Sequence, residues 1–419
     1  MKPKKVCTEP FDRRREPPRQ NLFLTPLMWA ACWLLTRSGR LKINKVRMKG
    51  AKPPFLVLGT HHAFMDFYVT PLALFPYRAN YVSELEGFES YGEWIYRQAG
   101  ALGTRKFVSD PALVQNIRRV IARGDSLVLY PEARYANVGT SSVLPTSVGK
   151  LAKLLGVPVV TINMRGNYLQ SPIWNLTRRK GVPLEADVTQ LFTREELADA
   201  SLEQVQEAIQ AALAYDEYRW QAERKICISY EKRADGLEAV LYQCPRCRRE
   251  FEMRTRGAEI FCGGCGASWH MNEWGQLEPE DTAAAVHIPD WYEWQREEVH
   301  RALLAGAYHL EMRVRIESLP NAKNFIDLGE GVLQHNGAGF SLTFTDYGQT
   351  REQVLHIPPV TMPSVHTEYD YRGKGQCITL STADNTYFIY PLEAGFNATK
   401  IQFATEGLYH MAKGIPIHQ

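Results

Sequence analysis

"PPFLVLGTHHAFMDFYVTP", residues 53–71, is the stretch from which the fold of the first half of the chain can be predicted. Its opening part, PPFLVLG, is typical of a short buried strand, because an apolar run is bracketed by proline and glycine. Two histidines, His61 and His62, follow in a turn, and Asp66 comes where a helix is expected to begin. A buried strand that leads through a polar turn into a helix is one repeat of an α/β fold.

Strand-like and helical stretches alternate around this repeat, from about residue 55 to residue 190. Further strands are expected near residue 81 and at 125–133 and 157–166, with helices at 111–124 and 148–156. One long amphipathic helix, capped by Ser201, is expected over residues 201–224. The alternation predicts an α/β core that covers residues 51–225.

The whole chain has 419 residues, of which 45% are hydrophobic and 23% are charged. That length predicts two or three domains, and the composition excludes a disordered chain. The formal net charge of +3 is too small to indicate nucleic acid as a partner.

Positive charge is concentrated at the amino terminus, where residues 1–20 form a basic tail whose prolines disfavour a helix. The apolar segment at 21–35, NLFLTPLMWAACWLL, is shorter than the roughly 20 residues that span a bilayer. It carries two tryptophans and is flanked by cations. We therefore expect residues 21–50 to attach to the cytoplasmic face of an anionic membrane without crossing it. A helix that packs inside the protein is the alternative.

The histidines at the end of the first strand allow two interpretations. On a helix, His62 and Asp66 lie four positions apart and face each other, as an ordinary capping or surface pair would. The functional interpretation is that one imidazole is a general base, with Asp66 fixing its tautomer and stabilising its cation.

Two later stretches bear on that choice. AGALGTRKF, residues 99–107, predicts a turn of small residues around Gly103, followed by Arg105, which is a typical phosphate ligand. A solvated turn is the alternative. VLYPEARYANVGTS, residues 128–141, places Glu132 at the end of a buried strand, where charges are rarely found without a function, and Arg134 follows.

In this order, the four blocks resemble the glycerolipid acyltransferases of the lysophosphatidic acid acyltransferase type. The matching residues are His61 and Asp66, Gly100 and Arg105, Tyr130 to Glu132, and Val157 with Pro158. The resemblance covers roughly residues 20–220. Thr60, Ala63 and Ala133 depart from the usual Asn, Ser and Gly of the family.

The resemblance implies that a fatty acyl group moves from acyl-CoA or acyl carrier protein to the hydroxyl of a glycerolipid such as 1-acylglycerol-3-phosphate. It selects His61 as the base and Asp66 as the residue that orients it. It places Gly103, Arg105, Glu132 and Arg134 in the site for the acceptor and its phosphate. Two alternatives stay open: a lipid-binding adaptor with an inactive core, and the same chemistry on a different acceptor.

A second motif lies after the core. Cys244, Cys247, Cys262 and Cys265 form two Cys-x2-Cys pairs separated by 14 residues, which is the spacing of a zinc ribbon. Four cysteine ligands predict a closed, structural zinc site within residues 238–275. The other four cysteines are scattered, as in a cytosolic protein.

The tail, residues 286–419, predicts a helix at 289–306, several strands up to about residue 391, and a last helix. Strands closed by one helix resemble a pleckstrin-homology or GRAM-like barrel. A generic β-sandwich is the alternative for this all-β domain.

Overall fold

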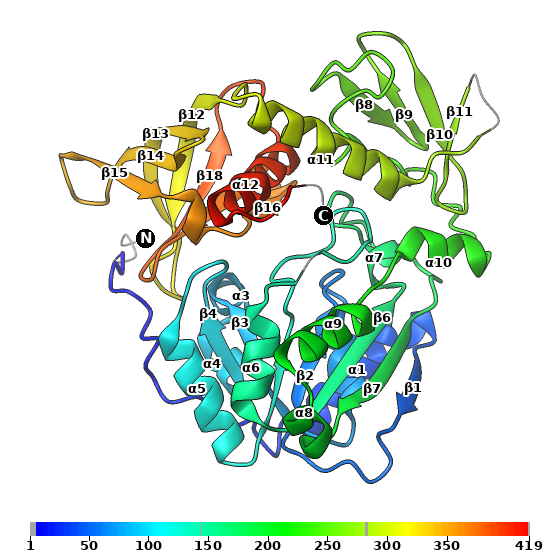
Figure 1. Ribbon diagram of the computed structural model, residues 1–419, viewed down its shortest axis with the longest axis vertical. Helices are drawn as coiled ribbons and strands as arrows, with labels where there is room; N and C mark the ends of the chain where they lie inside the picture. The colour runs from blue at the N-terminus through cyan, green and yellow to red at the C-terminus, as the bar shows by residue number, and fades with distance from the viewer. Residues whose placement is uncertain (1–5, 143, 281–283, 418–419) are drawn as a thin grey trace, which may run out of the picture. The chain divides into compact units, whose positions relative to one another are not determined.

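The computed structural model describes residues 6–142, 144–280 and 284–417 of the chain. It divides into two compact units (Figure 1). The first, called the α/β unit, comprises Asp12–Thr104 and Asp110–Ile228. The second, called the antiparallel unit, comprises Arg105–Ser109, the chain from Ser229 onward, and the described residues before Asp12.

The α/β unit is built on a seven-stranded sheet with the order β1-β7-β6-β2-β5-β3-β4. All neighbouring strands are parallel except β6 and β7. The strands are β1 Lys42–Val46, β2 Leu56–Gly59, β3 Ala79–Glu84, β4 Ala101–Thr104, β5 Ser126–Leu129, β6 Val159–Arg165 and β7 Glu185–Phe192. The helices are α1 Thr25–Thr36, α2 Asp66–Leu74, α3 Leu85–Tyr91, α4 Glu93–Gln98, α5 Pro111–Ala122, α6 Ser147–Leu155, α7 Asn167–Gln170, α8 Arg194–Asp199, α9 Leu202–Ala212 and α10 Glu217–Glu223.

Strand β2 lies near the middle of this sheet and is completely buried. Its side chains alternate between two apolar clusters: Val57 packs on one face of the sheet, and Leu56 and Leu58 pack on the other. This period of two is what a strand covered on both faces requires. Since β2 and β5 are parallel neighbours, the residues that follow them meet at one edge of the sheet.

The expected α/β layer is therefore confirmed, but two local predictions are wrong. Residues 201–224 form two helices, α9 and α10, because Asp216 caps a new helix and Glu217 turns inward to bind Gly166. The predicted turn around Gly103 is strand β4, which pairs with β3.

Residues 6–20 contain no helix, in agreement with the prolines there. Their backbone carbonyls are bound by side chains of the α/β unit: Asn116 donates to the carbonyl of Arg13, and Arg123 donates to those of Pro17 and Pro18. The first five residues of the predicted basic tail lie outside the described residues. No helix in the described part of the chain is long and apolar enough to cross a membrane.

The antiparallel unit contains a second seven-stranded sheet, ordered β15-β14-β13-β12-β18-β17-β16. Its strands are β12 Leu310–Ser318, β13 Ile326–Asn336, β14 Gly339–Thr345, β15 Glu352–Ile357, β16 His366–Glu368, β17 Cys377–Ser381 and β18 Thr386–Pro391. Helix α12, Ala398–Lys413, follows and packs against α11, Ile288–Leu304, through Phe403 and Tyr292. The expected all-antiparallel domain followed by one helix is confirmed.

A four-stranded antiparallel sheet in the same unit carries the cysteine pairs. Its strands are β8 Met253–Arg256, β9 Glu259–Cys262, β10 Ser268–Met271 and β11 Leu277–Pro279. Trp269 packs against Trp291 of α11, and the Trp291 indole donates to the Gln243 carbonyl at 2.9 Å. Helix α11 therefore contacts both the ribbon and α12.

Candidate active site and metal centre

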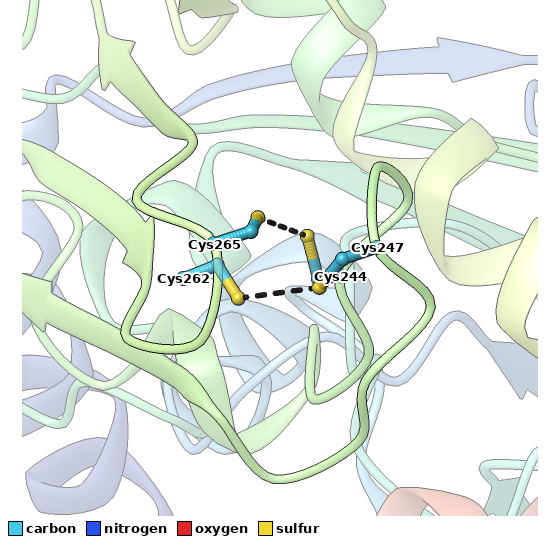
Figure 2. A group of neighbouring side chains, drawn as sticks. All are labelled: Cys244, Cys247, Cys262 and Cys265. Carbon is cyan, nitrogen blue, oxygen red and sulfur yellow. Dashed lines mark hydrogen bonds between the residues drawn. The ribbon is translucent and has the colours of Figure 1, made fainter.

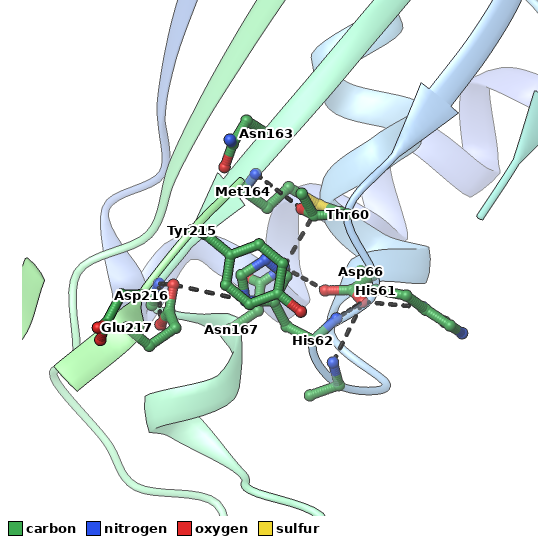
Figure 3. A network of polar contacts seen from close by, with 12 residues as sticks. Thr60, His61, His62, Asp66, Asn163, Met164, Asn167, Tyr215, Asp216 and Glu217 are labelled. Carbon is green, nitrogen blue, oxygen red and sulfur yellow. Dashed lines mark hydrogen bonds and ion pairs between the residues drawn. The ribbon is translucent and has the colours of Figure 1, made fainter. Parts of the chain in front are cut away.

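A histidine and a carboxylate lie in contact just beyond the carboxyl end of β2. His61 Nδ1 is 3.1 Å from Asp66 Oδ2, and both side chains are buried (Figure 3). Asp66 is the first residue of α2, so its position is set by the helix start. A neutral imidazole that donates Nδ1–H to Asp66 keeps a lone pair on Nε2, as a general base requires.

Asp66 is held by donors on both of its oxygens. The amides of His62 and Ala63 donate to Oδ2 at 2.6 Å and 3.1 Å, while Asn167 Nδ2 donates to Oδ1 at 2.6 Å. The carboxylate is thereby fixed in position and can stabilise an imidazolium at His61.

Aromatic rings fix the His61 imidazole. Tyr130 stacks on it with 4.5 Å between ring centroids, and Tyr135 and Phe67 lie at 4.6 Å and 5.8 Å. Among the residues that the structure describes, none forms a hydrogen bond with His61 Nε2. The imidazole is thus held by one nitrogen while the other remains available to a substrate.

Glu132 lies beside His61 but binds protein groups. Its carboxylate accepts from the His61 amide at 3.2 Å, from the amide and hydroxyl of Ser142 at 3.1 Å, and from the Tyr215 hydroxyl. Burial raises the pKa of Glu132. The predicted role of Glu132 in positioning an acceptor stays a prediction. In the structure its carboxylate links the backbone after β2, at His61, to Ser142 and Tyr215.

The backbone turns sharply directly after Glu132. Ala133 has φ +57°, in the left-handed region where glycine is favoured, and its amide donates to the Tyr130 carbonyl. Arg134 follows and is buried. Its assignment to the acceptor site remains a prediction.

Arg105, the predicted phosphate ligand, is buried within the antiparallel unit. Its guanidinium donates to the carbonyls of Leu319, Pro320 and Asp384 at 2.9, 2.7 and 3.0 Å, and to the Thr386 hydroxyl at 2.9 Å. Gly103 lies in the α/β unit, within β4. The assignment of both residues to one phosphate site stays a prediction.

A second histidine–carboxylate contact lies beneath the first, and sequence reasoning missed it. His62 is completely buried, stacks on Tyr215 at 3.9 Å, and lies with Nδ1 3.4 Å from Glu217 Oε1. Burial lowers the pKa of His62 to about 4 and raises that of Glu217 to about 8. Both groups are therefore uncharged near neutral pH, and His62 is a core residue.

Asn167 was missed as well, because it is 101 residues from Asp66 in the chain. The one available signal was its place two residues after the end of β6, the strand that lies beside β2 in the sheet. Glu217 gave no signal at all, since it lies in what reads as a continuous amphipathic helix.

The four cysteines predicted to bind zinc converge in the structure (Figure 2). Their sulfur atoms all lie within 4.8 Å of one another, with 3.8 Å between Cys244 and Cys265 and 3.7 Å between Cys247 and Cys262. Tetrahedral Zn–S bonds of about 2.3 Å place sulfurs about 3.8 Å apart. The cluster therefore fits a metal such as zinc, held by four thiolates as a structural cross-link.

Both pairs sit on similar tight turns. In the first, the Arg248 amide donates to the Cys244 carbonyl, and in the second, the Gly266 amide donates to the Cys262 carbonyl. Arg248 and Gly266 both have positive φ, at 60° and 74°. The matching backbone explains how two sequences of different composition aim their thiols at one point.

Comparisons with known proteins add a distant likeness to a solved structure. No family model matches this chain, and no curated protein matches it. Among solved structures, the chain is similar to the crystal structure of the 1-acyl-sn-glycerophosphate (LPA) acyltransferase PlsC from Thermotoga maritima. The match has 14% sequence identity and a TM-score of 0.39, and it covers 46% of this chain and 77% of that one. A TM-score this low assigns neither fold nor activity.

Proposed function

We propose that this protein is an O-acyltransferase that moves a fatty acyl group from a thioester donor to the hydroxyl of a glycerolipid such as 1-acylglycerol-3-phosphate. One observation carries the proposal: a buried His61–Asp66 pair whose outer nitrogen, Nε2, has no hydrogen-bond partner among the described residues. The donor is acyl-CoA or acyl carrier protein.

The chemistry follows from that geometry. His61 Nε2 takes the proton of the acceptor hydroxyl, and the oxygen attacks the thioester carbonyl carbon. The C–O bond forms, the C–S bond then breaks, and the departing thiolate takes the proton back from the imidazolium. Asp66 stabilises the imidazolium between these steps, as the aspartate of a Ser-His-Asp triad does, with the acceptor supplying the oxygen.

The remaining parts of the chain support this reaction. We assign residues 21–50 to monotopic attachment at the cytoplasmic face of an anionic membrane, where amphiphilic acceptors are found. The zinc ribbon stabilises its own fold, and exposed arginines such as Arg246, Arg254 and Arg256 suit an anionic surface or an acidic carrier. The seven-stranded sheet followed by α12 is assigned to a pleckstrin-homology or GRAM-like domain.

The test is acyl transfer by purified protein, followed by mass spectrometry of the lipids formed from candidate acceptors and acyl donors. His61→Gln should lower kcat by about two to four decades, the usual contribution of a general base. His62→Gln is the comparison: its loss should appear mainly as lower stability, because His62 is enclosed in the core. Full activity of the His61→Gln protein would exclude the proposed base.

The second candidate function is a lipid-binding adaptor with an inactive core. The burial of Arg105 among carbonyls favours it, because a phosphate acceptor then lacks its expected guanidinium. The same assay separates the two functions: an adaptor would bind lipid without forming any product from any donor.

A further inference from the structure

Helix α1 is unusual in being apolar on all sides while much of it is exposed. Only Thr25, Cys32 and Thr36 of its residues are buried, and Leu27 and Trp33 are 66% and 59% exposed. A helix that is apolar all round is normally enclosed by protein or by lipid. Its 12 residues span about 18 Å, too little to cross the roughly 30 Å apolar core of a bilayer.

A second helix of the α/β unit presents the same kind of surface. None of the residues of α4 is buried, and Trp94 and Ile95 are 67% and 54% exposed. Tyr91, at the end of α3, is also exposed. Isolated exposed apolar residues need no explanation, but a contiguous group of them marks an interaction surface.

The two helices form one surface. A groove of about 150 Å³ runs between them, lined by Leu24 and Met28 on one side and by Trp94 and Ile95 on the other. Asn21, just before α1, donates its amide to the Gln98 carbonyl at 2.9 Å. The apolar surface therefore continues from residues 22–24 across to α4.

The same surface leads towards the candidate active site. Exposed Phe64 stacks on Tyr91 with 6.0 Å between centroids, and it lies 5.6 Å from Phe67. Phe67 in turn lies 5.8 Å from His61. A chain of aromatic rings thus connects α3 and α4 with the catalytic imidazole.

Cations lie on both sides of α1 in the sequence and indicate the occupant of its exposed surface. Exposed Arg37 and Arg40 follow the carboxyl end of α1 and line a separate groove with Trp33, and neither forms an ion pair with any residue that the structure describes. Exposed Arg14 lies in the tail before α1. Tryptophans beside cations suit the headgroup level of an anionic bilayer.

We propose that α4, together with residues 22–24 at the start of α1, inserts into an anionic lipid bilayer and forms a second contact point beside α1. Trp94 and Ile95 enter the lipid, and the row of rings from Tyr91 to His61 then faces the phase that holds the acceptor. This inference rests on the proposed function for its acceptor, but lipid contact itself is independent of catalysis.

The experiment is flotation of the full chain with vesicles of phosphatidylcholine and phosphatidylglycerol, in the absence of acyl donor. The double variant Trp94→Ser/Ile95→Ser should bind at least about tenfold more weakly, because two large apolar side chains no longer enter the lipid. Leu154→Ser is the matched control: Leu154 is 55% exposed on α6, and its variant should bind within about twofold of the parent.

A second measurement does not depend on affinity. Lipids brominated near the headgroup should quench part of the tryptophan fluorescence, and Trp94→Phe should remove a measurable share of that quenching. Unchanged quenching, or equal binding by the double variant and the parent, would overturn the inference. A change of oligomeric state in the double variant, with vesicle binding intact, would overturn it too, because the surface would then join two copies of the chain. Neither measurement uses an acyl donor, so failure of the proposed acyl transfer would not change the result of either one.

Discussion

At the scale of the residue, the candidate site depends on how firmly Asp66 is held. Asn167, the first residue of α7, donates a hydrogen bond to the second carboxylate oxygen of Asp66, Oδ1. Removing one partner of a buried hydrogen bond leaves the other unsatisfied, which costs about 1–3 kcal/mol.

The change Asn167→Leu should therefore lower kcat for acyl transfer by about tenfold to a hundredfold while leaving the acceptor KM nearly unchanged. Leucine has a similar volume but no donor, so Asp66 and the imidazole it orients lose one fixed contact. Steady-state kinetics with both substrates is the measurement. A raised KM with unchanged kcat would assign Asn167 to acceptor binding instead.

Glu217 makes the stability of the fold depend on pH. Its pKa is raised by burial from an ordinary value of 4.5 to about 8, so the folded chain keeps a proton that the unfolded chain has lost. The stabilisation is complete below about pH 4.5 and is lost as the pH rises to about 8. His62 has the opposite shift, and its contribution is lost only as the pH falls from 6.5 to about 4.

Between pH 6.5 and 8, the contribution of Glu217 to stability changes, while the contribution of His62 stays constant. The free energy of unfolding should fall by up to about 1.4 kcal/mol per pH unit in this window. Glu217→Gln should flatten that slope, as measured by denaturant unfolding at several pH values. Glu223→Gln, which alters an exposed side chain of the same helix, is the control, and equal slopes in all three proteins would contradict the assignment.

At the scale of the element, we expect the ribbon to depend on a metal. Its four strands have only three or four residues each, so thiolate–metal bonds should supply much of its folding energy. We expect one zinc per chain. Cys265→Ser should lose that zinc and make residues 240–275 sensitive to protease, whereas Cys227→Ser, an exposed cysteine outside the cluster, should change neither.

Metal analysis and limited proteolysis provide the measurements. Full-length protein that keeps a protease-resistant ribbon after complete chelation of zinc would show that the cluster has no structural role. The α/β unit should resist protease in every variant, because its sheet makes no use of these cysteines.

At the scale of the whole molecule, two roles of Arg105 can be distinguished: stabilising the antiparallel unit and binding a phosphate. Its guanidinium binds three carbonyls and one hydroxyl of the antiparallel unit. Arg105→Lys keeps the charge but loses the forked geometry, so it should destabilise this unit by about 3 kcal/mol, with little change in the acceptor KM. A phosphate ligand would behave differently: KM would rise and stability would stay the same.

Calorimetry and kinetics on the same preparation decide between these roles. Arg315→Lys is the control, because Arg315 forms an exposed ion pair with Asp327, and exposed pairs contribute little to stability.

The sequence by itself determined the alternation of buried strands with helices, the antiparallel tail and the cysteine cluster. These features are set by local patterns: apolar periodicity, turn residues and ligand spacing act within a few residues of one another. Helical spacing alone indicated His62 as the partner of Asp66, and the choice of His61 rested on the resemblance to the acyltransferases.

Only the tertiary structure decided which distant groups complete the site. Asn167 reaches Asp66 because the parallel strands β2 and β6 bring their carboxyl ends to one edge of the sheet, which no local pattern records. Glu217 reaches His62 from the start of α10, a helix boundary that the sequence pattern did not show. The break between α9 and α10 and the burial of Arg105 have the same origin. In each case a long-range hydrogen bond outweighs a local preference, and such bonds exist only once the chain has folded.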